Sequence, residues 1–317
     1  MSSMDYPIEI NSLVKRYGKG PMVLRGISIK IDKGEIVGYL GPNGSGKTTT
    51  IKMLTNLIKP TAGMVKIKGI DVQRYPKKAL KHVGALIEVP GIYDYLTPWE
   101  LLTYFGRVYG MRKKDIEGRI VEVLKEVKLS RSVDDKVGSF STGMQRRLMI
   151  AKSIFHDPEI IILDEPVIGL DPKGIKEVRE LVRRFGAQGK SVLMSSHLLS
   201  EVSDTCDRVI FLNNGKIVED DTIERIKEKA SIKRIDVSFI NHLDDRSIHS
   251  INTFKGVARV ERKNGGMSIY YDGLPETGRS ILKDMITAGF PLYSFTPGSG
   301  GLEEFYISIM GDEKGVN

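Results

Sequence analysis

Apolar positions along the first 230 residues switch between strand-like runs and helical spacing. Runs rich in branched and aromatic residues predict six strands, over residues 8–17, 27–31, 35–40, 160–163, 191–194 and 208–212. Helical spacing predicts helices over residues 50–57 and 175–185. Strands that alternate with helices are typical of an α/β core with a mostly parallel sheet.

A polar, helical stretch interrupts this alternation between about residues 90 and 155. Apolar residues recur there three and four positions apart, at Leu101, Leu102, Phe105, Ile116, Ile120, Val123, Leu124 and Val127. We therefore predict an α/β domain over residues 6–230 that carries a helical insert. A charged helix over residues 222–230 is expected to close this domain.

Residues 231–317 predict a second, smaller domain. Its elements follow the order strand, helix, strand, strand, helix, strand, over residues 234–240, 246–254, 257–262, 267–271, 276–289 and 291–296. This is the order of a ferredoxin-like α+β fold. A last helix is predicted over residues 302–310. His242 and His249, seven residues apart in a polar region, are interpreted as surface residues.

Composition indicates the cellular setting but does not decide the function. The 317 residues carry a net charge of +8, which suits nucleic acid, anionic lipid or an anionic ligand, or simply reflects solvated helix faces. No stretch reaches the roughly 18 to 20 uninterrupted apolar residues of a membrane helix. The start is polar, unlike a signal peptide, and the one cysteine, Cys206, cannot form an internal disulfide. We expect a cytoplasmic protein.

A glycine-rich loop stands between a predicted strand and a predicted helix. Residues 41–48 fit G-x-x-x-x-G-K-[ST], and the candidate phosphate-binding residues are Gly41, Pro42, Asn43, Gly44, Ser45, Gly46, Lys47, Thr48 and Thr49. The glycines let backbone N–H groups surround phosphates, and the helix dipole favours the anion. Lys47 would contact the β- and γ-phosphates, and the Thr48 hydroxyl would reach Mg²⁺. The alternative, a purely structural turn, does not account for the lysine and threonine.

Two carboxylates follow the buried-type strand at residues 160–163. An apolar strand that ends in Asp164 and Glu165 presents them to something, because an unpaired buried charge is costly. Asp164 would hold Mg²⁺, directly or through water, and Glu165 would polarise the attacking water as general base. The alternative is that one of them only caps a following helix.

The segment Phe140-Ser141-Thr142-Gly143-Met144-Gln145-Arg146-Arg147-Leu148 ends 16 residues before Asp164 (164 less 148). It resembles the signature sequence L-S-G-G-Q of ABC transporter ATPases, with Phe140, Thr142 and Met144 in place of Leu, Gly and Gln. Taken alone it would be an ordinary helix N-cap. The resemblance implies that Ser141, Gly143 and Met144 contact the γ-phosphate of ATP bound to a second subunit.

Other positions match the same family. Tyr17 stands where an aromatic residue stacks on adenine, although a strand-end tyrosine needs no such role. Glu88 stands at the place of the Q-loop glutamine and would serve the metal or its waters. Gly169-Leu170-Asp171 resembles the D-loop, which faces the partner subunit. His197 stands at the switch-histidine position and would bond the γ-phosphate.

The resemblance covers about residues 6–220 and implies a mechanism that needs two chains. Each signature would cover the ATP of the other chain, so two ATP molecules, with Mg²⁺, would be sandwiched in a homodimer. The permease would be a separate transmembrane subunit, contacted through residues 88–100 with Trp99, and would hold the chain at the inner face of the membrane. The signature variant, Glu88 and the ending Leu302-Glu303-Glu304-Phe305-Tyr306 resemble the drug and antibiotic-peptide exporter group.

Two alternatives belong to other classes of protein. One is a non-transport ABC ATPase that acts on nucleic acid or on the ribosome. Lys47 and Asp164 are only 117 residues apart (164 less 47) without an intervening coiled coil, and the chain has one cassette, so no nucleic acid is expected. The other is a regulatory module that binds ATP without hydrolysing it, and the presence of Glu165 and His197 argues against it.

Overall fold

The computed structural model describes residues 6–87, 93–231, 233–241, 250–263 and 266–297, together with residues 306 and 309. Glu88, His242, His249 and most of the predicted helix at residues 302–310 lie outside the described residues. The chain divides into two compact units, Met1–Asp221 and Thr222–Asn317. The helix predicted to close the first domain belongs to the second unit in this division.

A six-stranded sheet forms the centre of the first unit. Its strands are β3 (Ile36–Leu40), β6 (Val83–Leu86), β7 (Ile160–Leu163), β8 (Ser191–Ser196), β9 (Arg208–Asn213) and β10 (Lys216–Thr222). The order across the sheet is β10-β9-β3-β8-β7-β6, and the pairs β9–β3, β3–β8, β8–β7 and β7–β6 are parallel. The strands β3 and β7 are fully buried, which explains their unbroken apolar sequences.

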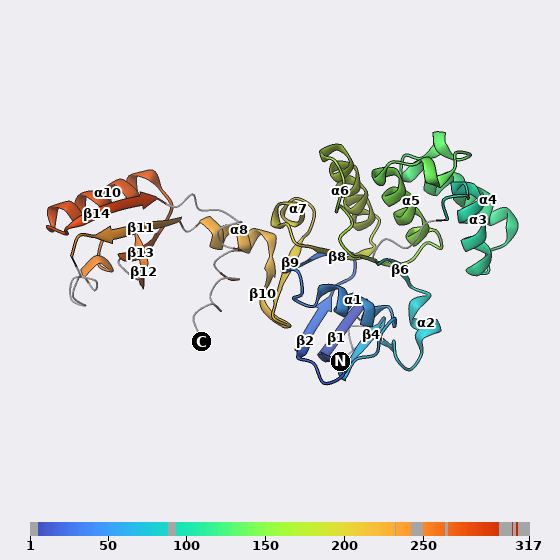
Figure 1. Ribbon diagram of the computed structural model, residues 1–317, viewed down its shortest axis with the longest axis horizontal. Coiled ribbons are helices and arrows are strands. Elements are labelled where there is room, and N and C mark those ends of the chain that lie inside the picture. Colours follow the sequence, from blue (N-terminus) through green and yellow to red (C-terminus); the bar gives the residue numbers. More distant parts are fainter. Residues whose placement is uncertain are drawn as a thin grey trace. The chain divides into compact units, whose positions relative to one another are not determined.

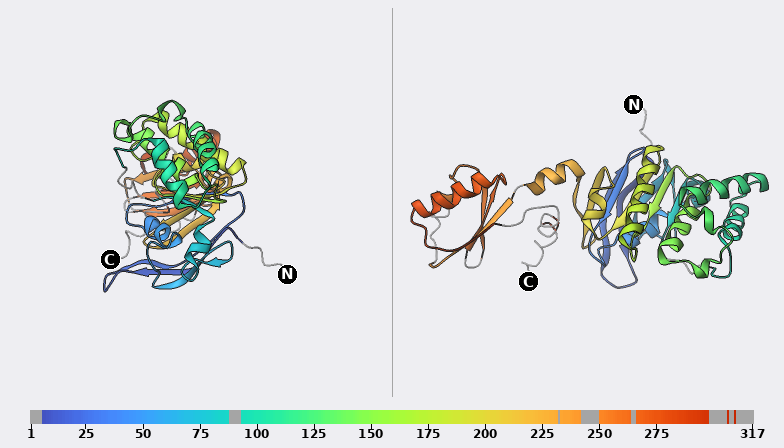
Figure 2. Two further views of the ribbon diagram at one scale, coloured as in Figure 1. Left: turned by 90° about the vertical axis from the view of Figure 1, so that its right-hand side faces the viewer. Right: turned by 90° about the horizontal axis from the view of Figure 1, so that it is seen from above.

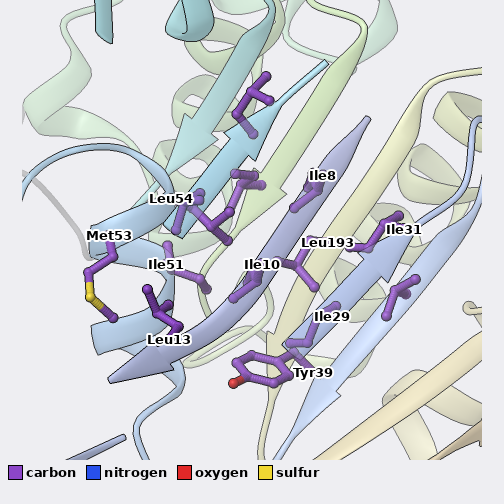
Figure 3. Packing of buried hydrophobic residues seen from close by; sticks show 14 of the residues in the cluster. Ile8, Ile10, Leu13, Ile29, Ile31, Tyr39, Ile51, Met53, Leu54 and Leu193 are labelled. Carbon is purple, nitrogen blue, oxygen red and sulfur yellow. The ribbon is translucent and has the colours of Figure 1, made fainter. Parts of the chain in front are cut away.

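A second, antiparallel sheet covers one face of the first. It contains β1 (Ile8–Arg16), β2 (Met22–Ile31), β4 (Ala62–Ile67) and β5 (Ile70–Asp71), in the order β2-β1-β4-β5. Helix α1 (Lys47–Leu54) packs with it, and the short α2 (Pro76–Leu80) lies nearby. Figure 3 shows the resulting core, in which side chains from β1, β2, β3, β8 and α1 converge. Inward residues of β1 and β2 alternate with exposed ones, as a half-solvated sheet requires.

Helices cover the opposite face, and some of them form the insert. Helices α6 (Pro172–Ala187) and α7 (Leu199–Ser203) pack on the central strands, and α5 (Thr142–Ile154) packs on β6 (Figure 1). Helices α3 (Pro98–Val108) and α4 (Lys113–Glu126) pack on each other and on α5, beyond one edge of the sheet (Figure 2). The short 3₁₀ turns Ser130–Ser132 and Val137–Ser139 join α4 to α5. This helical region lies between the neighbouring strands β6 and β7.

The second unit holds α8 (Ile223–Ser231), β11 (Lys233–Phe239), β12 (Val257–Lys263), β13 (Gly266–Tyr271), α10 (Pro275–Thr287) and β14 (Leu292–Pro297). The strands pair antiparallel in the order β12-β13-β11-β14. The first strand therefore lies between the third and the fourth, which is the ferredoxin-like arrangement. Ile235, Val237, Ile269 and Ile281 form part of its own apolar core.

The predicted fold class, an α/β ATPase core with a helical insert and a small α+β unit, is confirmed. Four strands were not predicted, namely β4, β5, β6 and β10. Helix α1 begins at Lys47, three residues before the predicted start at Thr50 (50 less 47), because its first turn is polar. Among the helices of the described residues, none combines the length and the apolar character needed to cross a membrane.

Candidate functional site

Three strand ends meet at one edge of the parallel sheet. Strand β8 lies between β3 and β7, with Leu40 opposite Ser196 and Leu163 opposite Met194. Because the strands are parallel, the segments that follow them start side by side. These segments are the glycine-rich loop after β3, the two carboxylates after β7, and His197 after β8. The sheet thus gathers groups that are up to 156 residues apart (197 less 41).

The glycine-rich loop wraps tightly around the start of α1. Gly46 caps the helix with a φ of 113°, a value that side-chain-bearing residues rarely adopt, and a Cβ there would lie 2.7 Å from Leu24 Cδ2. The first-turn N–H groups of α1 therefore point out of the loop. Pro42, Asn43 and Gly44 are exposed, Thr48 and Thr49 are half-buried, and Gly41 and Ser45 are buried. The buried Ser45 Oγ finds no hydrogen-bond partner among the described residues.

Lys47 is a buried cation directed at this loop. Its side chain is 6% exposed, and Nζ donates to Gly41 O at 2.7 Å and to Pro42 O at 3.3 Å. The same Nζ lies 3.6 Å from Glu165 Oε1. The loop therefore holds a positive charge next to free backbone donors, which is the chemistry that an anion requires.

A serine from β8 connects the two carboxylates after β7. Ser195 Oγ donates to Asp164 Oδ1 at 2.6 Å and accepts from Glu165 N at 2.9 Å. Asp164 is 4% exposed, and its own N–H donates to Leu86 O at 2.8 Å. Glu165 has a φ of 48°, a conformation that costs a non-glycine residue energy, and the Ser195 bond helps to hold it. The sequence analysis did not single out Ser195.

His197 completes a line of three charged or polar groups. Its Nδ1 lies 2.9 Å from Glu165 Oε2, so that the carboxylate contacts His197 on one oxygen and Lys47 on the other. With Nδ1 donating to the carboxylate, the neutral imidazole keeps Nε2 as an acceptor and the protonated one offers a second donor. The His197 side chain is 38% exposed, so Nε2 can reach a ligand.

Arg146 places a further cation near the carboxylates. This residue of α5 is 5% exposed and donates to Ile168 O at 3.5 Å. Burial lowers the pKa of Arg146, and the negative charges of Asp164 and Glu165 oppose that shift. The guanidinium stays charged, so it stabilises the two carboxylates from the side of α5. The sequence analysis quoted Arg146 only as part of the signature segment.

The remaining candidates lie on other elements. Tyr17 follows β1, is 49% exposed, and has Lys15 Nζ at 4.8 Å from its ring centroid. Ser141 is the exposed N-cap of α5 and accepts from Met144 N at 3.3 Å, while Gly143 and Met144 lie in the first turn. No hydrogen bond or ion pair within the described ranges joins Ser141 to the glycine-rich loop.

Comparison with known proteins agrees with this arrangement. Residues 24–168 match the family model described as ABC transporter. YdbJ of Bacillus subtilis (strain 168), described as an uncharacterized ABC transporter ATP-binding protein, is 35% identical over 301 residues, which are 95% of this chain and 94% of YdbJ. The bacitracin transport ATP-binding protein BcrA of Bacillus licheniformis is 34% identical over 305 residues, which are 96% of this chain and 97% of BcrA.

A solved structure gives the same fold. A dimeric ATP-binding cassette in a post-hydrolysis state, bound to ADP and phosphate, superposes with a TM-score of 0.62 at 26% identity. The match covers 68% of this chain and 98% of that cassette. Similarity along nearly the whole length of two relatives, with the glycine-rich loop and the acidic strand in matching order, is decisive. The chain belongs to the ATP-binding proteins of ABC transporters.

Proposed function

We propose that this chain hydrolyses Mg-ATP at the carboxyl edge of its parallel sheet and thereby powers export through a separate permease. The observation that carries the proposal is the contact of Glu165 with both Lys47 and His197, three residues from three different loops. A structural ion pair needs only two partners. A carboxylate between a phosphate-loop lysine and a partly exposed histidine suits a reacting water.

The binding of ATP would use groups that the loop already presents. Phosphate oxygens would replace Gly41 O and Pro42 O as partners of Lys47, and would accept from first-turn N–H groups and from Ser45 Oγ. The exposed ring of Tyr17 offers a flat face for the adenine. The basic loop side and the nearby Lys15 favour the anionic nucleotide.

The residues present also fit Mg²⁺. No group of three or more His, Cys, Asp or Glu in the described ranges could hold a metal by itself. Mg²⁺ characteristically takes one or two protein oxygens and completes its shell with phosphates and water. The Thr48 hydroxyl and Asp164 would supply those oxygens, and Ser195 fixes the Asp164 carboxylate. Bound there, the ion would neutralise charge that develops on the phosphates.

Hydrolysis would then proceed through Glu165 and His197. Glu165 accepts the proton of the attacking water, and Lys47 stabilises the negative charge on the transferred phosphoryl group. His197 orients the Glu165 carboxylate through Nδ1 and bonds a γ-phosphate oxygen through Nε2 when it is protonated. The chemistry needs no covalent intermediate on the chain.

A second copy of the chain would complete the site. Ser141, Gly143 and Met144 are at an exposed helix N-terminus, which attracts phosphate but has no phosphate site in its own chain. The structurally similar cassette was solved as a dimer. We infer a two-fold pair in which this helix end of one chain covers the ATP of the other.

The permease would contact the helical region around Trp99. This side chain lines an apolar pocket of about 390 Å³ with Ile120, Val121, Leu124 and Val133, and Asp134 stands at its rim. Val121 is 61% exposed, so the pocket is open to a partner. An amphipathic cytoplasmic segment of the permease with a basic end suits these walls and this rim. The exporter direction is supported by the subgroup resemblance and by a relative named for bacitracin transport.

Complementation between two defective chains tests the two-chain site. Lys47→Ala removes the phosphate lysine, and Ser141→Arg blocks the covering helix end, so each variant alone should lose ATPase activity. In an equal mixture, half of the dimers would pair the two variants, and each such dimer has one intact site of two, which restores about a quarter of the parental activity. A mixture as inactive as its components would contradict the two-chain site.

A further inference from the structure

A buried glutamate lies behind His197 and takes no part in the chemistry proposed above. Glu201 belongs to the five-residue helix α7 and is 4% exposed. Burial raises the pKa of Glu201, and a hydrogen bond from Ser196 opposes the shift. A buried carboxyl group costs stability unless its bonds serve a purpose. The positions of its partners show what that purpose is.

Glu201 bonds the residue directly before His197. Ser196 Oγ donates to Glu201 Oε2 at 2.6 Å, a length typical of a charge-assisted bond. The same Ser196 Oγ accepts from Leu198 N at 3.0 Å and so closes a turn with His197 at its centre. A hydroxyl has one proton, and Leu198 O at 3.4 Å competes for it poorly. The Glu201 bond therefore aims a Ser196 lone pair at Leu198 N–H.

Helix α7 is itself anchored to the sheet and to α6. Gly38 of β3 lies so close to Val202 that a Cβ there would come within 2.1 Å of Val202 Cγ1. From α6, Arg179 donates to Ser200 O at 3.2 Å and pairs with Asp204 at 3.2 Å. A short helix with so few turns is held by such contacts rather than by its own propensity. Glu201 is thus a fixed point behind the histidine turn.

We propose that Glu201 is a positioning residue that, through Ser196, holds the turn in which His197 presents Nδ1 to Glu165. Without the bond, the Ser196 hydroxyl can rotate to Leu198 O and release Leu198 N–H. His197 then samples other orientations, and the 2.9 Å contact with Glu165 is lost for part of the time. A site geometry maintained by a supporting residue is lost when that residue is removed, although no reacting group changes.

A double-mutant cycle on the full-length chain tests this proposal, which rests on the proposed role of His197. Glu201→Ala should lower kcat about tenfold with little change in KM for ATP, but less than about twofold when His197 is already alanine. Glu201→Gln retains an acceptor oxygen and should keep kcat within about threefold of the parent. Ser196→Ala removes the same bond at lower cost in packing and should behave like Glu201→Ala. Ile29→Val, a buried truncation far from the site, should lower the denaturation midpoint with kcat unchanged.

The outcomes separate this inference from the proposed function. If His197→Ala leaves kcat unchanged, the proposed role of His197 is wrong, and the inference with it. If His197→Ala lowers kcat but the Glu201→Ala loss is equally large in both backgrounds, Glu201 acts elsewhere and only the inference is wrong. A Ser196→Ala chain with parental kcat, or a Glu201→Gln chain as impaired as Glu201→Ala, would also overturn it. Should Glu201→Ala fail to fold, these last two variants still decide.

Discussion

Strand β7 has a lysine–glutamate–histidine group at each of its two ends. Before the strand, Glu159 contacts Lys68 at 2.5 Å and His82 at 3.0 Å. After the strand, Glu165 contacts Lys47 at 3.6 Å and His197 at 2.9 Å. The residue types are the same and the contacts of the first group are no longer than those of the second.

The two groups differ in what surrounds them. The Lys68 and Glu159 side chains are 37% and 55% exposed, so water screens their charges. Lys47 is 6% exposed and Glu165 20%, next to a helix N-terminus and to the buried Asp164. A charge in such surroundings acts more strongly on a ligand than the same charge in water. Residue types alone therefore do not make a site, and the carboxyl end of a parallel strand supplies the rest.

The two lysines should differ most. Lys47→Ala should lower ATPase activity by at least about 100-fold, because it removes a buried cation from the phosphate loop. Lys68→Ala, the matched change at the other end of β7, should leave activity within about twofold of the parent, since surface ion pairs contribute little. Steady-state phosphate release by the two purified variants measures this. Equal losses in both would show that the two ends are not functionally distinct.

Ser195 tests whether preorganised carboxylates matter. Ser195→Ala removes the group that bonds both Asp164 and Glu165 N, and should lower kcat about 10- to 100-fold and the free energy of unfolding by about 1–3 kcal/mol. Ser153→Ala is the control, because that buried serine only bonds Ile150 O within its own helix. Urea unfolding and ATPase assays on both variants give the two quantities. An unchanged kcat in Ser195→Ala would speak against the connecting role.

Ser141 separates helix capping from contact with a partner chain. Aspartate caps helices as well as serine does, so Ser141→Asp should change the free energy of unfolding by less than about 0.5 kcal/mol. Its negative charge would face the partner's γ-phosphate, and ATP-dependent dimerisation and kcat should both fall at least about tenfold. Ser141→Asn keeps the cap without the charge and should be milder. Light scattering with ATP would reveal normal dimers in Ser141→Asp if the helix end faces only solvent.

The smallest effect is expected from the pH dependence of stability at the exposed group. The hydrogen bond from Lys68 lowers the pKa of Glu159, and His82 adds to the shift. A depressed carboxyl pKa stabilises the fold above the unfolded pKa of 4.5, and this contribution is lost as pH falls through the folded value. Because Glu159 is largely exposed, Glu159→Gln should reduce the loss between pH 7 and the acid limb by less than about 0.5 kcal/mol. Urea midpoints across that range would show a larger effect if the pair were buried.

The sequence predicted most of the parallel sheet because buried strands leave unbroken apolar runs. It did not predict β10, an edge strand whose sequence Lys-Ile-Val-Glu-Asp-Asp-Thr is mostly charged and exposed. The pattern of β4 was equally weak, since Ala62, Gly63 and Met64 are exposed and its pairing with β1 is non-local. Both strands depend on neighbours that a local pattern does not contain.

The same limit applies to the site. Lys47, Asp164, Glu165 and His197 stand in recognisable segments, and the structure brings them together at one sheet edge. Ser195 and Arg146 matter through neighbours that are distant in sequence, so no local pattern marks their contacts. The available signal was two serines ending an otherwise apolar strand, where an unpaired hydroxyl would be costly.

The general base is the central claim, and β7 offers its own control. In Glu165→Gln we predict a fall in the hydrolysis rate of at least about 100-fold while the Kd for ATP stays within about threefold, because the amide binds but does not accept a proton. Glu159→Gln, the same change at the other end of the strand, should hydrolyse ATP within about twofold of the parent. Single-turnover hydrolysis and ATP titration of both proteins measure this. A Glu165→Gln chain that hydrolyses ATP within tenfold of the parent would contradict the account.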